Sequence, residues 1–268
     1  MKKIMLAAAA ACGAYLYLVK GRSGHPGLQQ LQKFSYAHRG LHGKGIPENS
    51  MAAFRAALEN GYGIELDIHL MKDGKLAVIH DTSLLRTAGV DVNITDLTAE
   101  DLPKYPLNDQ GELIPTFDQV LELFAGKAPL IIEIKEDGNC RKVVNAAVRA
   151  MRGYEGPYCM ESFHPKCIYE LKKRYPHIIR GQLVMDYFKE EDSPLPKAVK
   201  WLITNQAENF LTMPDFIAYR FSDRKTFSNI LTQKFWKLQG VSWTLKSQEE
   251  LDEAVAEGWL PIFEGFKP

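Results

Sequence analysis

The sequence is poor in cysteine and carries no excess of charge of either sign. Only four cysteines occur among 268 residues, and no two have the Cys-x-x-Cys spacing. Cys12 lies in an apolar N-terminal segment, so three scattered cysteines remain for the rest of the chain. An odd, scattered set argues against a disulfide framework and makes a structural zinc site unexpected. The 33 basic and 33 acidic residues balance, which argues against a nucleic-acid-binding protein, because such proteins carry a basic excess.

Internal repeats and low-complexity tracts are also missing, and what remains is typical of one globular unit. Hydrophobic residues make up 46% and charged residues 25% of the chain, as in ordinary soluble domains. When the N-terminal segment is set aside, about 235 residues remain, which is enough for one large core or an α/β barrel.

An apolar run, Ile4–Val19, opens the chain between basic residues on both sides. It fits a secretory signal, a lipoprotein signal at Cys12, an uncleaved membrane anchor or, least well, a soluble helix. The run continues beyond Cys12, which disfavours the lipoprotein, and no clear break follows it, which disfavours cleavage and secretion. Its sixteen residues are short for a bilayer span, yet the membrane anchor fits best. We therefore expect an anchor or signal at 1–22, a linker at 23–33 and one barrel domain at 34–268.

Three consecutive predicted strands, at 34–38, 63–70 and 76–79, end in polar residues. In the second strand, strict alternation places Glu65 and Asp67 on one face and aliphatic residues on the other. Taken alone, this pattern is usual for a half-solvated strand. If the acids face the inside of a barrel, however, they need a partner, and a bound cation is a natural one.

The first and third strands add groups for proton transfer and phosphate binding. His38 and Arg39 end the first strand, and His80 follows the third. Imidazole transfers protons near neutral pH, and a guanidinium matches the geometry of a phosphate. In a parallel barrel, residues at such strand ends carry the chemistry. Each motif alone is commonplace, but their joint occurrence in this order favours a metal-assisted phosphodiester hydrolase.

A further strand, 130–135, offers a third carboxylate. It is an apolar run interrupted by Glu133. One acid in such a run often marks the solvent end of a strand, but beside Glu65 and Asp67 a metal ligand is the better interpretation. Three carboxylates in an oxygen-lined site suit Mg²⁺ or Ca²⁺ better than zinc.

The rest of the chain alternates strands with helices. This repetition predicts a (β/α)8 TIM-type barrel behind the N-terminal hydrophobic segment, rather than a doubly wound sheet. We expect the excursion 82–116 to shape the substrate pocket, and Phe163 and Trp243, each at a strand end, to wall it. Further helices are predicted at 49–59, 117–124, 143–152, 166–173, 227–237 and 247–257, and further strands at 158–163, 178–183, 216–219, 240–244 and 262–263. The pattern does not decide which strand closes the barrel.

These residues together resemble the glycerophosphodiester phosphodiesterase family, from about Phe34 to Leu245. The motifs that carry the resemblance are His38-Arg39-Gly40, Pro47-Glu48-Asn49-Ser50, Glu65-Leu66-Asp67, His80-Asp81, Ile114-Pro115-Thr116, Glu133-Ile134-Lys135, Ser162-Phe163 and Trp243-Thr244. The resemblance implies that His38 and His80 are the catalytic pair. It implies that the metal ligands are Glu65, Asp67 and Glu133. Arg39 and Lys135 would contact phosphate, with Glu48 supporting the site from outside. The family usually has an Asn shortly after the Trp-Thr pair, and this chain lacks it, which leaves the preferred alcohol open.

The reaction implied by the resemblance is hydrolysis of a glycerophosphodiester to glycerol 3-phosphate and an alcohol. One metal ion would polarise the phosphoryl group, with His38 as base and His80 as acid. The nucleophile would be water or the substrate's own glycerol hydroxyl, which would give a cyclic phosphate. Two rivals are a phospholipase D that cleaves intact membrane phospholipid and a non-catalytic lipid-binding protein. The expected partners are a small-molecule substrate and, through the N-terminal segment, a membrane; the oligomeric state is open.

Overall fold

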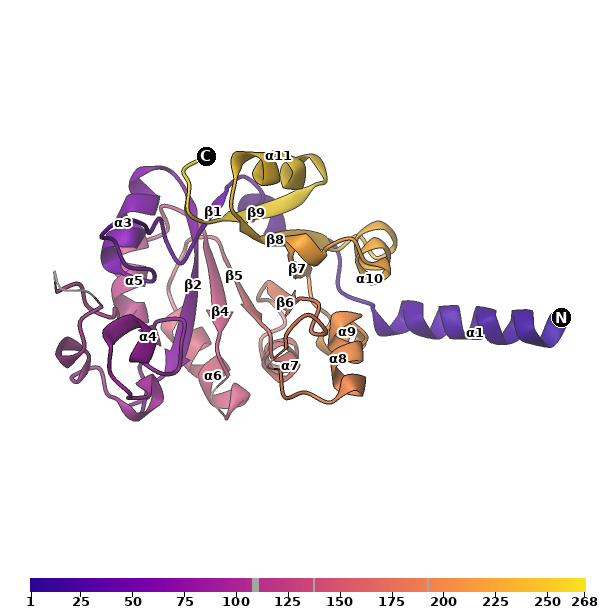
Figure 1. Ribbon diagram of the computed structural model, residues 1–268, viewed down its shortest axis with the longest axis horizontal. Helices are drawn as coiled ribbons and strands as arrows, with labels where there is room; N and C mark the ends of the chain where they lie inside the picture. The colour runs from indigo at the N-terminus through magenta and orange to yellow at the C-terminus, as the bar shows by residue number, and fades with distance from the viewer. Residues whose placement is uncertain (108–110, 137, 192) are drawn as a thin grey trace.

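The protein is described by a computed structural model that covers residues 1–107, 111–136, 138–191 and 193–268. Within these residues, eight parallel strands close into a barrel (Figure 1). They are β1 (Tyr36–His38), β2 (Gly63–Leu70), β4 (Leu130–Ile134), β5 (Tyr158–Ser162), β6 (Arg180–Val184), β7 (Phe216–Arg220), β8 (Gln239–Leu245) and β9 (Trp259–Phe263). The first strand pairs with both β2 and β9. The predicted barrel is therefore confirmed, and the strand that contains residues 262–263 closes it.

The strand that precedes His80 does not belong to the barrel. β3 (Leu76–Val78) runs antiparallel to β2 and forms a hairpin with it. The sequence interpretation of three successive barrel strands was wrong at this point. The connection 71–75 is too short for a parallel crossover, which needs about a dozen residues. Gly74 has a φ of 82° and allows the tight turn.

Helices surround the barrel as the βα pattern predicts. They are α3 (Met51–Glu59), α5 (Phe117–Phe124), α6 (Cys140–Ala150), α7 (Pro165–Arg174), α8 (Lys197–Thr204), α9 (Asn209–Thr212), α10 (Phe227–Ile230) and α11 (Gln248–Ala256), with a π-helical turn η4 (Leu231–Phe235). Ser50 caps α3 by accepting a hydrogen bond from the Ala53 N–H at 3.1 Å. The predicted helix 227–237 is divided into α10 and η4, and α8 was not predicted.

The excursion after β3 folds around its own small core. It contains α4 (Leu85–Ala88), η1 (Ile94–Asp96) and η2 (Leu102–Lys104), and another short turn, η3 (Phe221–Asp223), follows β7. We call the buried residues under the excursion the excursion core: Met71, Ala77, Ile79, Leu84, Ile94, Leu97, Leu102 and Ile114. Part of the prediction for 82–116, residues 108–110, lies outside the described residues.

The barrel interior is apolar at one end and polar at the other. Inward side chains of the lower layers, among them Tyr36, Ile131 and Phe216, pack together. Gly181 leaves room for the Phe216 ring, because a Cβ there would lie 2.0 Å from it. Inward positions nearer the carboxyl ends of the strands carry acids and histidine instead. This division directs the polar groups to the end of the barrel where parallel strands usually place a site.

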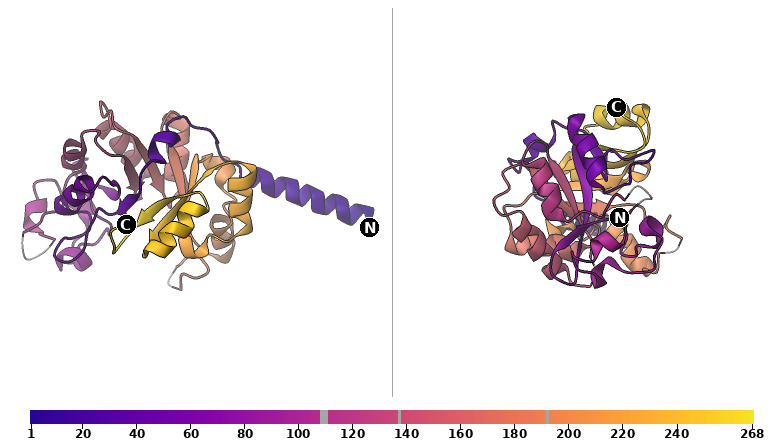
Figure 2. Two further views of the ribbon diagram at one scale, coloured as in Figure 1. Left: turned by 90° about the horizontal axis from the view of Figure 1, so that it is seen from above. Right: turned by 90° about the vertical axis from the view of Figure 1, so that its left-hand side faces the viewer.

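The N-terminal residues form a helix that extends from the barrel (Figures 1 and 2). α1 (Lys2–Leu18) has 17 residues, none of them buried. No helix in the described residues meets the length and hydropathy needed to cross a bilayer. The residues that follow are held against the barrel: Val19 is buried, Arg22 pairs with Asp215, and α2 (Leu28–Leu31) seals the apolar end of the barrel.

Candidate active site

Three carboxylates meet at the polar end of the barrel. Glu65 and Asp67 lie on β2 and Glu133 on β4, and the strand register pairs Asp67 with Glu133. All three are buried, with exposures of 3%, 1% and 7%. One oxygen from each lies within 4.8 Å of the others. The alternation read from the sequence therefore turns both acids of β2 inward, and this oxygen-only donor set fits a divalent cation.

Two cations partly neutralise this carboxylate cluster. Lys135 Nζ lies 2.8 Å from Asp67 Oδ1 and 2.6 Å from Glu133 Oε1. Arg39 Nε lies 3.5 Å from Asp67 Oδ2, and Asn49 Nδ2 donates a hydrogen bond to the same oxygen at 2.8 Å. Burial raises the pKa of Asp67, but Lys135, His80 and Arg39 outweigh burial and hold that pKa well below its usual range. Asp67 is therefore ionised.

The other carboxyl groups experience the opposite balance. Burial raises the pKa of Glu65, and the charges of Asp67 and Glu133 raise it further. Burial also raises the pKa of Glu133 to about 7, although Lys135 opposes it. Glu161 on β5 is a fourth buried acid, with a raised pKa and an Oε2 that has no hydrogen-bond partner in the described chain. The cluster is thus under-neutralised, which is the condition that a bound divalent cation relieves.

Each predicted catalytic histidine is oriented by a carboxylate. His38 Nδ1 hydrogen-bonds the carboxylate of Glu264, and its Nε2 lies 3.8 Å from Glu65 Oε2. His80 Nδ1 lies 2.6 Å from Asp81 Oδ1. Both rings therefore keep Nε2 for proton transfer. Burial lowers the pKa of His80, and His38 holds the pKa of Glu264 at about 2.

Arg39 and Glu48 connect the barrel to the excursion. Arg39 adopts a positive φ of 54°, and its backbone N–H donates to Glu65 Oε2 at 3.1 Å. Its guanidinium donates to Glu48 at 3.0 Å. Arg86 on α4 binds both Glu48, at 2.6 Å, and Asp81. Glu48 is thus placed between two guanidinium groups, one at the site and one on the excursion.

A hollow of about 700 Å³ adjoins the carboxylate cluster. Its polar wall includes His80, Glu133 and Lys135. Its other walls are largely apolar and consist of Ile134, Phe163, Pro165, Tyr187, Leu195, Val199 and Ile203. The ring of Trp243 packs edge-on against Phe163 at a centroid distance of 5.4 Å, but Trp243 lines a neighbouring hollow with Arg220 and Lys246.

The structure brings the polar residues singled out in the sequence into one network. His38, Arg39, Glu48, Glu65, Asp67, His80, Glu133 and Lys135 are linked by the contacts described above, Phe163 borders the hollow and Trp243 lies behind Phe163. Sequence reasoning missed the supporting residues Asn49, Asp81, Arg86, Glu161 and Glu264. Asn49 and Asp81 stood within quoted motifs, and Glu264 directly follows the apolar C-terminal strand. Arg86 carries no signal in the sequence.

A sequence model of the Glycerophosphoryl diester phosphodiesterase family matches residues 38–255. The glycerophosphodiester phosphodiesterase of Caldanaerobacter subterraneus subsp. tengcongensis is 38% identical over 160 residues, which are 55% of this chain and 65% of that protein. The Bacillus altitudinis protein of the same name is 34% identical over 169 residues, which are 59% and 69% of the two chains. The chain thus spans about two thirds of these relatives. Human lysophospholipase D GDPD1 is 37% identical over 116 residues, 38% of this chain and 36% of that protein.

Solved structures share the fold. An Oleispira antarctica phosphodiesterase in complex with the product sn-glycerol-3-phosphate superposes with a TM-score of 0.70 at 21% identity, over 86% of this chain and 92% of that one. A glycerophosphodiester phosphodiesterase from Thermotoga maritima gives a TM-score of 0.65 at 24% identity, over 86% and 93%. Both likenesses agree with the barrel described above.

Proposed function

The chain belongs to the glycerophosphoryl diester phosphodiesterase family, as its motifs predicted, and on that premise we propose that it hydrolyses glycerophosphodiesters to glycerol 3-phosphate and an alcohol. The observation that carries the proposal is the carboxylate cluster of Glu65, Asp67 and Glu133, with one oxygen from each within 4.8 Å of the others. Two carboxylate-oriented histidines and two cations surround it. A divalent cation, Mg²⁺ or Ca²⁺ by the all-oxygen donor set, would supply Lewis-acid activation of the phosphoryl group.

The charges around the two histidines support roles opposite to those assigned from the sequence. Burial lowers the pKa of His80, so the ring is neutral near pH 7 and suited to accept the nucleophile's proton at Nε2. His38 Nδ1 hydrogen-bonds Glu264, which leaves Nε2 for transfer of a proton to the leaving oxygen. Arg39 and Lys135 add positive charge where negative charge develops on the phosphoryl oxygens.

A second substrate class is favoured by the apolar hollow. A water-soluble headgroup has no use for a wall of Phe163, Leu195, Val199 and Ile203, whereas one acyl chain does. In a monoacyl glycerophosphodiester, the chain would lie along α8 while the diester reaches Lys135. This proposal also agrees with the name of the human relative, a lysophospholipase D. Intact two-chain phospholipid, the rival considered from the sequence, is the third substrate to compare.

We also propose that α1 holds the protein at a membrane surface. Two exposed aromatic side chains pack against the C-terminal part of α1: Trp201 is 48% exposed and Phe227 64%. Tyr15 of α1 stacks on Phe227 at 6.2 Å. An unburied apolar helix beside such a patch offers apolar surface that lipid can cover. Full-length protein should stay with membranes in a high-salt wash and be released by detergent at its unprocessed mass; release by salt, or a loss of roughly twenty residues by signal cleavage, would contradict this.

The activity is tested by metal-dependent release of glycerol 3-phosphate. Glycerophosphocholine, glycerophosphoethanolamine and glycerophosphoglycerol should be hydrolysed with Mg²⁺ or Ca²⁺ and not with a chelator. A lysophospholipid and its diacyl parent are run beside them to rank the substrate classes. Glu65→Gln is the matched control, because it keeps the side-chain size and removes the charge. Absence of metal-dependent hydrolysis on every diester would refute the proposal.

A further inference from the structure

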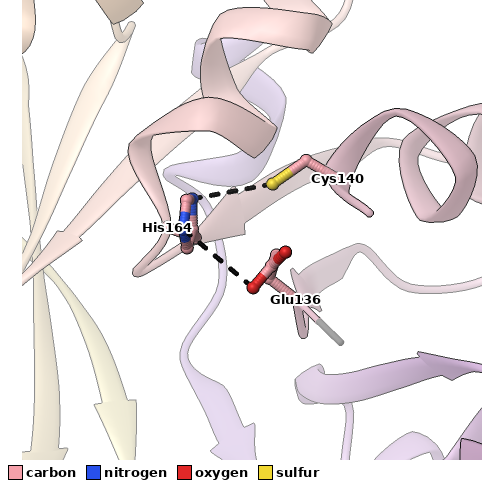
Figure 3. A group of neighbouring side chains, drawn as sticks. All are labelled: Glu136, Cys140 and His164. Carbon is pink, nitrogen blue, oxygen red and sulfur yellow. Dashed lines mark hydrogen bonds and ion pairs between the residues drawn. The ribbon is translucent and has the colours of Figure 1, made fainter. Parts of the chain in front are cut away.

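A second group of potential metal ligands borders the same hollow (Figure 3). It comprises Glu136 after β4, Cys140 at the start of α6 and His164 at the start of α7. Cys140 Sγ lies 3.6 Å from His164 Nδ1. Glu136 Oε2 lies 4.0 Å from His164 Nε2. One donor atom from each residue lies within 4.8 Å of the others, and Figure 3 shows the thiol and the carboxylate on the same side of the ring.

The donor chemistry differs from that of the carboxylate cluster. Sulfur, nitrogen and one oxygen suit a borderline-soft cation such as Zn²⁺, whereas the oxygen-only cluster suits Mg²⁺ or Ca²⁺. Donor atoms around tetrahedral zinc lie about 3.4–3.7 Å apart, given the usual bond lengths. The Sγ to Nδ1 distance of 3.6 Å already has this value. Nδ1 also accepts the Lys166 N–H at 3.3 Å, and a cation bound there would displace that hydrogen bond. The Glu136 carboxylate, which is 24% exposed and lies 4.0 Å from the other ring nitrogen, would have to turn toward Nδ1.

Buried side chains surround the sulfur of the group. Cys140 is 7% exposed, and Cys167 on α7 is fully buried. All four cysteines of the chain are free thiols. The site is therefore closed on its sulfur side, and it opens on the other side to the hollow, because Glu136 and His164 line that hollow. An incoming cation has both an entry path and a position for water or substrate.

The same three residues also have the order of a nucleophile, a base and an orienting acid. A nucleophilic thiol would need to face the hollow. Cys140 is 7% exposed and is not among the residues that line it. The burial of the sulfur thus favours a ligand over a nucleophile.

We propose that Glu136, Cys140 and His164 form a second cation site that binds Zn²⁺ and leaves the fourth position of the ion open to the hollow. The bound ion joins the segment that follows Lys135 to the start of α7, on either side of the substrate hollow. Sequence analysis did not find this site, because its ligands come from two separate segments, 136–140 and His164, and contain no Cys-x-x-Cys pair.

Cobalt titration of the full-length protein with its thiols reduced tests this site without recourse to activity. Co²⁺ bound through thiolate absorbs in the near ultraviolet by sulfur-to-metal charge transfer, which carboxylate ligands do not produce. We expect this band with one equivalent of Co²⁺ in the wild type and in Glu65→Gln, and its displacement by Zn²⁺. Cys140→Ser should lose the band, whereas Cys159→Ser, which alters a buried cysteine of the barrel interior, should keep it.

His164→Asn provides a second variant, because asparagine retains the cap on α7 while removing the imidazole. Zn²⁺ affinity should fall more than about 100-fold in it, since even groups behind a ligand cost 10–100-fold. Circular dichroism checks that both variants are folded. A wild type without the band, or a band that survives in folded Cys140→Ser, would overturn the proposal. Either result leaves the phosphodiesterase assignment intact, because that rests on the carboxylate cluster.

Discussion

Replacing Glu65 by Gln should make the metal-free protein more stable and the metal-loaded protein inactive. Glu65 is 3% exposed, its pKa is raised by burial and by two neighbouring carboxylates, and its Oε2 accepts the Arg39 N–H. Gln can accept that hydrogen bond without bringing a charge. Because Gln is neutral at every pH, it removes the free-energy cost of burying this carboxyl group, and we expect the free energy of unfolding at pH 7.5 to rise by about 1–4 kcal/mol. Asp67→Asn should instead lower the free energy of unfolding of the metal-free protein.

Asp67 contacts Lys135 at 2.8 Å and Arg39 at 3.5 Å. Removing its charge leaves both cations short of a partner, and breaking such a buried pair costs about 3–5 kcal/mol. Metal binding should also separate the wild type from both variants. At a concentration of 100 times its Kd, it should stabilise the wild type by about 2.7 kcal/mol. Neither variant should gain this increment. Each kcal/mol corresponds to about 2–4 °C in Tm for a chain of this size.

The pH dependence of stability shows whether the Glu65 carboxyl group causes the difference between Glu65→Gln and the wild type. The folded-state pKa of Glu65 lies above its ordinary value of 4.5, so between these two values the folded state holds a proton that the unfolded state has lost. Stability of the metal-free wild type therefore falls as pH rises through that window. Glu65→Gln should lack this part of the slope, so its advantage is larger at pH 7.5 than at pH 5.

Thermal unfolding with chelator and with Mg²⁺ or Ca²⁺, at both pH values, measures all of these quantities. The reasoning fails if metal-free Glu65→Gln is less stable than wild type, or if it still gains stability from the metal.

Three further outcomes follow from the site and the N-terminus. His38→Ala and His80→Ala should each lower kcat by roughly 10²–10⁴ in a steady-state assay, and the double variant should lose less than the product; a change in KM alone would refute the acid and base roles. A chain that begins at Val19 should have a free energy of unfolding in urea about 3 kcal/mol or more above that of a chain that begins at Leu28. The chain from Leu28 lacks the fully buried Val19 and Arg22, the partner of the buried Asp215. Equal urea midpoints for the two chains would contradict this. Val199→Asp should raise KM for a lysophospholipid at least tenfold and leave KM for glycerophosphocholine nearly unchanged, and equal effects on both would exclude the apolar hollow as an acyl site.

The barrel and the carboxylate cluster could be predicted because both depend on patterns within single strands and helices. Alternation along β2 fixes which side chains share a face, and the register then pairs Asp67 with Glu133. The closing strand could not be chosen, since nothing local distinguishes β9 from a strand at the edge of an open sheet.

The hairpin was misread although its signal was present. Asp73-Gly74 between two strands predicts a turn, and the five residues from 71 to 75 rule out a crossover. Other features depend on distant segments. Glu264 reaches His38 across 226 positions, and Arg86 reaches Glu48 across 38. Contacts of this kind depend on how the barrel closes and how the excursion folds, so a local sequence motif cannot predict them. Helix α8 was missed because it follows a stretch rich in proline and charge that hides its start.

Because His80 is carried by the β2–β3 hairpin and the excursion core, loss of activity and loss of the barrel need not coincide. Proteins open in cooperative units of unequal stability, and the excursion rests on eight buried apolar residues of its own rather than on the barrel core. Opening of the excursion would displace His80 and the contacts of Arg86 with Glu48 and Asp81, while the carboxylate cluster stays assembled. We therefore expect inactivation at a lower temperature than global unfolding, with metal still bound in between. Faster amide hydrogen exchange at 79–106 than in β4 to β6 would reveal that state, and uniform exchange would rule it out.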